Sequence, residues 1–223
     1  NNRYFNELVL QSFFGRTNID LANKYLLTLS FRADGSSLFR EDKRWGYFPA
    51  AALAWKLKEE SFFKNTNAIN DLKLRIGEDI TGAVGFYPST PLFTLGSDTS
   101  QYLNGSNLYS ARAFNENLTW EKTTTYNLGL DFDIFKNNLI SGSFDIYRRN
   151  TTDLLAQTPV PPGQSLSNLF IQNVGETESK GFELNMNIKP IQTEDYSLEF
   201  NTNIAYNYTE VTDLSGLTSI PAG

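Results

Sequence analysis

Apolar and polar residues alternate along most of this chain with a period of two, the pattern of β-strands that have one apolar face. In residues 125–134 the apolar side chains occupy even positions, from Tyr126 to Ile134, while polar residues or glycine occupy odd ones. The pattern predicts eight strands: Leu8–Asp20, Tyr25–Asp34, Gly46–Lys58, Leu72–Thr81, Thr119–Phe135, Leu139–Asn150, Glu176–Pro190 and Tyr196–Glu210. The best helical signal is short, at residues 59–65. The sequence therefore predicts an all-β, antiparallel fold.

The turn after residue 135 tests whether neighbouring strands bring their apolar rows to one face. A three-residue loop, Lys136–Asn138, places Leu128 opposite Ile146. A two-residue loop would put each apolar residue opposite a polar one, because a slip of one residue turns a strand over. We therefore expect the three-residue loop, with Asn138 in the left-handed conformation. The same parity at the other short turns predicts two further facing pairs, Phe13 with Phe31 and Met186 with Phe200.

The predicted connections alternate between short and long. The short ones span residues 21–24, 59–71, 136–138 and 191–195, and the long ones span residues 35–45, 82–118 and 151–175. All short turns then lie at one end of the sheet and all long loops at the other. Long strands with this asymmetry are typical of an outer-membrane β-barrel, and we favour that fold over a soluble sandwich. Aromatic residues near strand ends fit interfacial girdles: Tyr25, Trp45, Tyr47, Trp55, Trp120, Tyr126, Tyr206 and Tyr208.

Composition removes whole classes of function. The 223 residues include no Cys and no His, which excludes disulfide scaffolds, zinc fingers and catalytic sites built on Ser-His or Cys-His pairs. Nineteen basic residues stand against 25 acidic ones, and the net charge of −6 argues against nucleic acid as a partner. The mean hydropathy of −0.37 is that of a soluble protein, but barrel strands alternate and average out as polar.

A series of segments carries specific strings in chain order. They are Tyr25–Phe39, Arg44–Trp55, Leu72–Arg75, Leu118–Asp131, Asp145–Tyr147, Thr152–Leu155 and Asn173–Leu184. Together they resemble the signatures of the SusC/RagA family of TonB-linked outer-membrane proteins, over nearly the whole chain. One departure is Gly77–Gly82, which carries Glu78 and Asp79 where the family usually has neutral residues. The sequence offers no role for these two carboxylates.

The resemblance implies an antiparallel barrel of 22 strands in the outer membrane of a Gram-negative bacterium, to which this chain contributes about eight. The chain begins without an initiator Met or a signal peptide. We therefore expect residues 1–223 to be an internal part of one barrel domain, without the plug domain and without the ends of the barrel.

The same resemblance implies active import of oligosaccharides or peptides. A SusD-like surface lipoprotein would capture the substrate, and TonB would act through the absent plug. The alternatives are a passive porin or adhesin barrel and a soluble all-β glycan-binding module. We expect no enzymatic activity and no cofactor.

Aromatic and polar residues in the loop of residues 82–118 are the candidate contacts for a ligand or partner. They are Phe86, Tyr87, Phe93, Tyr102, Tyr109, Arg112 and Phe114. Aromatic planes beside amides suit sugar faces and peptide backbones. The competing interpretation is that these residues pack the loop against itself. The proline-containing loop of residues 151–175 is a second candidate surface for the lipoprotein.

Three carboxylates, Asp131, Asp133 and Asp145, are expected to project into the lumen. A catalytic pair or a calcium site is conceivable for such residues. Solvated lumen charge is the interpretation we favour, because barrel interiors are polar. We therefore predict neither a catalytic residue nor a metal site.

Overall fold

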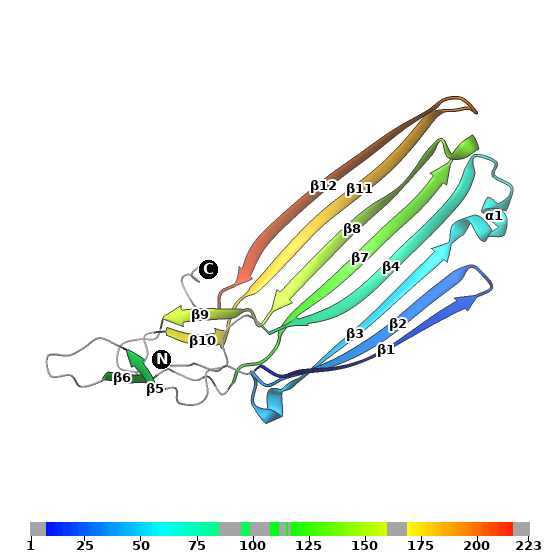
Figure 1. Ribbon diagram of the computed structural model, residues 1–223. Helices are drawn as coiled ribbons and strands as arrows, with labels where there is room; N and C mark the ends of the chain where they lie inside the picture. The colour runs from blue at the N-terminus through cyan, green and yellow to red at the C-terminus, as the bar shows by residue number, and fades with distance from the viewer. Residues whose placement is uncertain are drawn as a thin grey trace.

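The computed structural model describes residues 8–84, 95–98, 108–111, 115, 117–159 and 169–215, most of which form one curved antiparallel sheet (Figure 1). Its eight strands lie in the order β1-β2-β3-β4-β7-β8-β11-β12. Their bounds are β1 Leu10–Leu21, β2 Tyr25–Ser36, β3 Trp45–Lys56, β4 Ile69–Ala83, β7 Glu121–Ile134, β8 Ile140–Thr152, β11 Glu176–Gln192 and β12 Ser197–Asp213. All eight predicted strands are confirmed, with ends within three residues of the predicted ones.

The connections hold further elements. Two small hairpins, which the alternation did not predict, lie within the long loops: β5 (Leu95–Asp98) with β6 (Leu108–Ala111), and β9 (Leu155–Pro159) with β10 (Leu169–Asn173). The helical elements are single turns: η1 (Glu41–Lys43), η2 (Leu57–Glu59), α1 (Ser61–Lys64) and η3 (Lys136–Asn138). No helix in the described part of the chain is long and apolar enough to cross a membrane.

The register confirms the predicted three-residue loop. Leu128 pairs with Ile146, and Asn138 has a φ of 53°. The two other predicted pairs share a face but are wrong by two positions: Phe13 pairs with Ala33, and Met186 pairs with Thr202. The first turn lies one residue later than expected, because Ala22 and Asn23 take the left-handed conformation and Leu21 stays in the strand. The second pairing continues to a register shift between Ile188 and Ile191.

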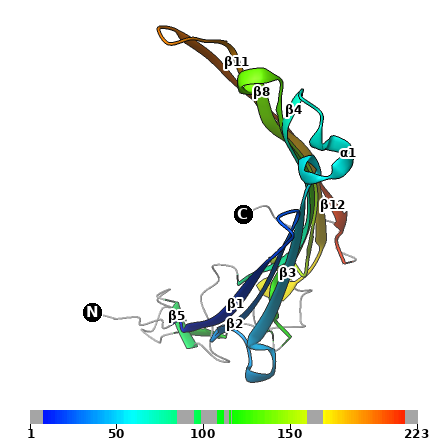
Figure 2. The same cartoon turned by 90° about the vertical axis from the view of Figure 1, so that its right-hand side faces the viewer.

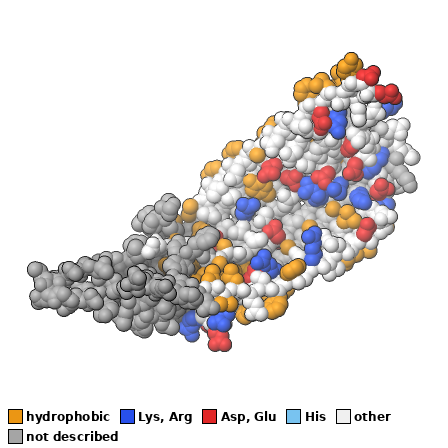
Figure 3. All heavy atoms as spheres, viewed as in Figure 1, with side chains coloured by type: hydrophobic (Ala, Val, Ile, Leu, Met, Phe, Trp, Pro, Cys, Tyr) orange, Lys and Arg blue, Asp and Glu red, His pale blue; other side chains and the backbone are white. Residues whose placement is uncertain are grey.

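The two faces of the sheet differ in polarity. Figure 2 shows the sheet edge-on as an arc, and Figure 3 views its concave face, where charged side chains gather along the middle. The convex face carries the apolar rows, and many of its large side chains are exposed, among them Phe31, Ile76 and Phe200. An apolar face of this extent requires an apolar environment.

All short turns gather at one end of the sheet, and all long connections gather at the other (Figure 1). The strand ends of the short-turn end are joined by residues 22–24, 57–68, 135–139 and 193–196. The strand ends of the long-loop end are joined by residues 37–44, 84–120 and 153–175. The predicted alternation of connections is therefore confirmed, and the two hairpins of the long loops lie at one end only.

Glu60 joins several elements of the short-turn end. It accepts hydrogen bonds from Lys24 Nζ at 2.9 Å, from Tyr25 Oη at 2.9 Å and from Trp55 Nε1 at 3.1 Å. The rings of Tyr25 and Trp55 stack on the convex face with centroids 6.1 Å apart. Each ring therefore packs its apolar surface on this face and directs its polar atom to the turn, as expected of an interfacial aromatic residue.

The Glu60 network predicts a dependence of stability on pH. The hydrogen bond from Lys24, followed by those from Trp55 and Tyr25, lowers the pKa of Glu60 below its ordinary value of about 4.3. Glu60 therefore contributes stability above pH 4.3, and that contribution is lost as the pH falls through the lowered pKa. We expect urea-unfolding midpoints to fall more between pH 7 and pH 3 in the wild type than in Glu60→Gln. Equal slopes in the two proteins would contradict this prediction.

Candidate functional site

The loop residues predicted to contact a ligand lie almost entirely outside the described residues. These are Phe86, Tyr87, Phe93, Tyr102, Arg112 and Phe114. For Tyr109 the structure describes the backbone, which pairs with Ser97 between β6 and β5. Their role stays a prediction. The described residues offer two candidate surfaces instead, the long-loop end and the concave face.

An aromatic cluster of Phe39, Phe48 and Trp120 lies at the long-loop end, packed against Ile80, Val84 and Leu118. The ring of Trp120 lies 5.4 Å from that of Phe39 and 5.5 Å from that of Phe48, centroid to centroid. A Cβ atom on Gly46 would lie 2.5 Å from the nearest atom of the Phe48 ring, so this glycine makes room for the cluster. The pairing between β3 and β4 extends only as far as Ala50 and Asp79. Phe48 lies two residues beyond this last pair along β3.

The cluster corrects one sequence prediction. Trp120 was expected in an interfacial girdle, but only 4% of its surface is exposed. Its indole Nε1 donates to the carbonyl of Arg44 at 3.1 Å, in the connection between β2 and β3. Trp120 therefore fastens one long loop to the start of β7. The sequence pattern could not predict this role, because Trp120 precedes β7. Outside a strand, the alternation of residues no longer determines the direction in which a side chain points.

Asn173 ties three further segments of the long-loop end together. Its Nδ2 donates to the carbonyls of Thr119 at 2.9 Å and Asp153 at 2.8 Å, and its Oδ1 accepts from the backbone N–H of Thr119 at 2.9 Å. The next residue, Val174, is buried and donates its N–H to the carbonyl of Leu154. One amide side chain thus satisfies three backbone groups from two loops.

Additional hydrogen bonds extend this arrangement. Asn115 Nδ2 donates to the carbonyl of Ile171 at 3.1 Å, and the N–H of Leu155 donates to Glu121 Oε2 at 3.2 Å. Lys43 Nζ donates to Asn117 Oδ1 at 3.1 Å. The loops between β2 and β3, before β7, and between β8 and β11 are therefore joined into one surface, which we call the loop platform.

A cluster of four charged side chains lies on the concave face. Arg75 Nη2 lies 2.7 Å from Asp131 Oδ1 and 3.0 Å from Asp145 Oδ1, and Lys73 Nζ lies 2.8 Å from Asp131 Oδ2. Gly129 pairs with both Arg75 and Asp145, and a Cβ there would lie 2.7 Å from the guanidinium carbon of Arg75. The missing side chain lets Arg75 reach across β7 to β8.

This cluster refines the prediction for the three carboxylates. Asp131, Asp133 and Asp145 all lie on the concave face, as predicted. Asp131 and Asp145 are paired with cations rather than solvated singly, and Asp133 accepts a hydrogen bond from Asn70. In this cluster two cations therefore balance two carboxylates. Within the described ranges, no three His, Cys, Asp or Glu side chains are grouped to hold a metal ion.

The concave face also presents a polar hollow of about 360 Å³ between β8, β11 and β12. Hydroxyl and amide side chains line it: Ser141, Ser143, Asn185, Asn187, Asn201 and Asn203. Asn187 donates to Asn201 Oδ1 at 2.9 Å, and Asn203 donates to Asn185 Oδ1 at 3.3 Å. Neutral groups of this kind suit a wet lumen through which hydrogen-bonding solutes pass.

An open sheet with an apolar convex face and a polar concave face has the chemistry of a barrel wall. Residues 1–221 match the family model described as TonB dependent receptor-like, beta-barrel. The chain belongs to this family. Its sheet is therefore an outer-membrane β-barrel wall, with the convex face toward lipid and the concave face toward the lumen. Membership excludes the soluble glycan-binding module.

Several curated relatives share this region. The chain is 45% identical over 219 residues to the TonB-dependent receptor SusC of Bacteroides thetaiotaomicron, covering 96% of this chain and 22% of that protein. It is 38% identical over 209 residues to the TonB-dependent receptor P39 of Formosa agariphila, covering 92% of this chain and 20% of that protein. The chain thus spans about a fifth of the length of these relatives.

Solved structures agree. The RagAB peptide transporter matches with a TM-score of 0.80 at 29% identity, covering 94% of this chain and 23% of that one. The RagAB peptide importer in its open-open state matches with a TM-score of 0.81 at 30% identity, covering 94% of this chain and 23% of that one. The siderophore receptor PirA from Pseudomonas aeruginosa shares the fold, with a TM-score of 0.60 at 20% identity.

Proposed function

We propose that this chain forms part of the wall of an active importer that takes oligosaccharides or peptides across the outer membrane. The observation that carries the proposal is the open sheet. Strands β1 and β12 each have one unpaired edge among the described strands, and open edges are not tolerated in lipid. Further strands must then continue the sheet on both sides. Residues 1–223 are accordingly one part of a larger barrel domain.

The loop platform is the surface we assign to a SusD-like lipoprotein. Its loops lie at the long-loop end, which faces outward in barrels with this asymmetry. Asn173 satisfies three of its backbone groups and so ties its loops together, and a partner that meets a preformed surface loses less entropy on binding. TonB is assigned no contact with this sheet, since it would act through a plug elsewhere in the protein.

Two substrate classes remain in the proposal. RagAB, to which this fold is similar, is described as a peptide transporter, which favours peptides. The relative with 45% identity is SusC, and the resemblance of this chain to the SusC/RagA family keeps oligosaccharides as the second class. Both are solutes rich in hydrogen-bonding groups, which the hydroxyl and amide hollow on the concave face suits.

Uptake by cells tests this function. A strain that lacks the full-length gene is compared with the same strain after complementation with that gene. The uptake of labelled oligosaccharides and peptides is measured with and without a protonophore. We expect uptake of one substrate class to require both the gene and the proton gradient. Uptake that persists after the gradient is dissipated would identify a passive porin and contradict the proposal.

A further inference from the structure

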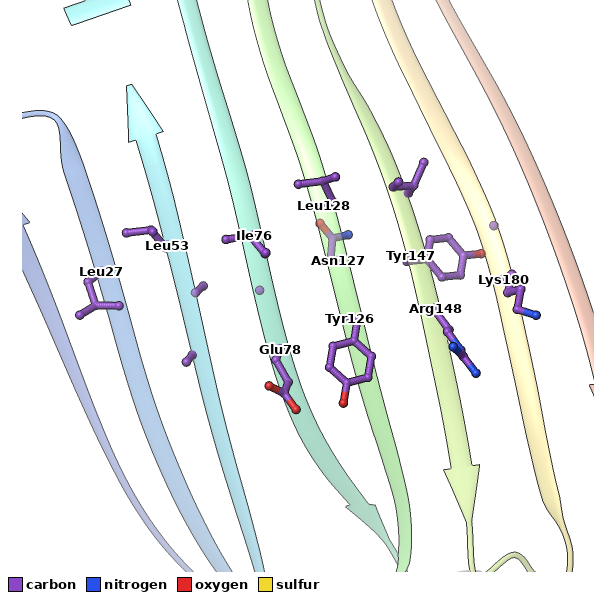
Figure 4. A pocket seen from close by; sticks show the side chains of 15 residues that line it. Leu27, Leu53, Ile76, Glu78, Tyr126, Asn127, Leu128, Tyr147, Arg148 and Lys180 are labelled. Atoms are coloured by element: carbon purple, nitrogen blue, oxygen red, sulfur yellow. The ribbon is translucent and has the colours of Figure 1, made fainter. Parts of the chain in front are cut away.

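A groove of about 640 Å³ lies on the convex face, toward the long-loop end of its apolar belt (Figure 4). One row of directly paired residues forms its apolar part: Leu27, Leu53, Ile76, Leu128 and Ile146. The next row toward the long loops is mixed: Ala51, Glu78, Tyr126, Arg148 and Lys180, again as direct partners. The groove therefore joins an apolar surface to a line of polar side chains.

Two cations are held at one end of the groove. Arg148 and Lys180 both form ion pairs with Glu178, whose side chain is 10% exposed. Their own side chains remain 56% and 54% exposed. Glu178 thus fixes the two cations from beneath and neutralises one of them. The exposed parts of the Arg148 and Lys180 side chains can therefore receive an anion.

A carboxylate stands at the other end. Glu78 is exposed, and no hydrogen bond or ion pair joins its side chain to any residue that the structure describes. It lies two strands from Arg148, about 10 Å at the usual strand spacing, with Tyr126 between them. Figure 4 shows Glu78, Tyr126 and Arg148 side by side, with their side chains directed toward the same end of the strands.

The depth of this row matches the headgroup region. Arg148 lies eight residues after Ile140, where β8 begins. At about 3.3 Å per residue and a tilt of about 40°, this places it about 20 Å from the short-turn end. The lipid-facing band of such barrels is about 25 Å tall. Glu78, Arg148 and Lys180 therefore lie near its outer margin, where lipid headgroups begin.

We propose that this groove binds a lipid that carries a phosphoethanolamine headgroup. The phosphate binds Arg148 and Lys180, the ammonium binds Glu78 beside the ring of Tyr126, and an acyl chain lies along the apolar row. A headgroup with both charges matches both ends of the groove, whereas a purely anionic one leaves Glu78 repelling it. The proposal gives Glu78, for which the sequence offered no role, a specific partner.

A second copy of the chain is a poorer occupant. Two convex walls touch only along a narrow strip, so a groove between them stays unfilled and its apolar row gains little from the contact. A flexible acyl chain follows a shallow groove readily. Phosphoethanolamine has two sources, a phospholipid and a glycolipid modified with the same group, and both present the same headgroup chemistry.

Native mass spectrometry of the full-length transporter in detergent tests the proposal. Phosphatidylethanolamine, phosphatidylglycerol and phosphoethanolamine-modified lipid A are titrated separately. We expect one retained molecule with phosphoethanolamine and about fivefold weaker retention of phosphatidylglycerol, the contribution of one exposed ion pair of about 1 kcal/mol. The tighter of the two phosphoethanolamine lipids identifies the source.

Variants on opposite faces of the same strands provide matched controls. Glu78→Gln should abolish the preference over phosphatidylglycerol, and Arg148→Ser should weaken both lipids. Asp79→Asn and Arg149→Ser, the neighbouring residues on the concave face, should change neither. Equal retention of the two phospholipids by the wild type would overturn the proposal. So would absence of retained lipid together with cross-linking between two copies of a Tyr126→Cys variant.

Discussion

Replacing Leu128 with arginine is expected to destabilise the folded barrel by about 2–4 kcal/mol, the cost of a cation on the lipid face near the bilayer midplane. Leu128 lies on the convex face, paired with Ile76 and Ile146, and it is 40% exposed in the described sheet. It stands six residues from the end of β7 at Ile134, which is about 15 Å from the short-turn end. Urea unfolding of the full-length protein in lipid vesicles measures the loss.

The adjacent residue supplies the control. Asn127 lies on the concave face opposite Gly77, beside a hollow of about 350 Å³. Asn127→Arg inserts the same side chain into the lumen and should cost less than about 1 kcal/mol. Similar losses for the two variants would mean that the convex face does not contact lipid, and the assignment of the two faces would be wrong.

The alternation of residues predicted the sheet well because one face of every strand is apolar. A strand shifted by one residue would turn its apolar row to the polar face, so parity is specified along the whole chain. A shift by two residues keeps the parity, and the two wrong predictions of strand register are shifts of this kind. Phe13 and Met186 each pair two positions from the expected partner, because turn geometry and a register shift, rather than polarity, decide between such alternatives.

The candidate site was predictable only where it follows the strand pattern. Asp131 and Asp145 were placed on the lumen face correctly, since their direction follows from parity. Arg75 was not connected to them, because its reach depends on the space above Gly129. Asn173 and Trp120 lie in loops, where no period sets direction, and their partners are distant in sequence. Both residues lie in segments that carry the family resemblance, but only the folded chain shows their hydrogen-bond partners.

Truncating Trp120 to alanine should cost about 3–5 kcal/mol, the usual loss for a fully buried aromatic side chain. Trp120 packs against Phe39 and Phe48, and its indole holds the carbonyl of Arg44. The loop between β2 and β3 should open when both contacts vanish. Hydrogen exchange is the measurement: the amide of Ser36, which donates to Arg44 at 3.1 Å, should lose protection before the strands do.

Trp120→Phe separates packing from hydrogen bonding. Phenylalanine keeps most of the ring contacts with Phe39 and Phe48 but cannot donate to Arg44, so it should cost only about 1 kcal/mol beyond a small loss of volume. Protection at Ser36 should then fall partly. If the two variants lose equal stability, the hydrogen bond rather than the aromatic cluster holds the loop. Because the loop platform is built on this end of β7, that outcome would also move its main support from the aromatic cluster to the hydrogen bond between Trp120 and Arg44.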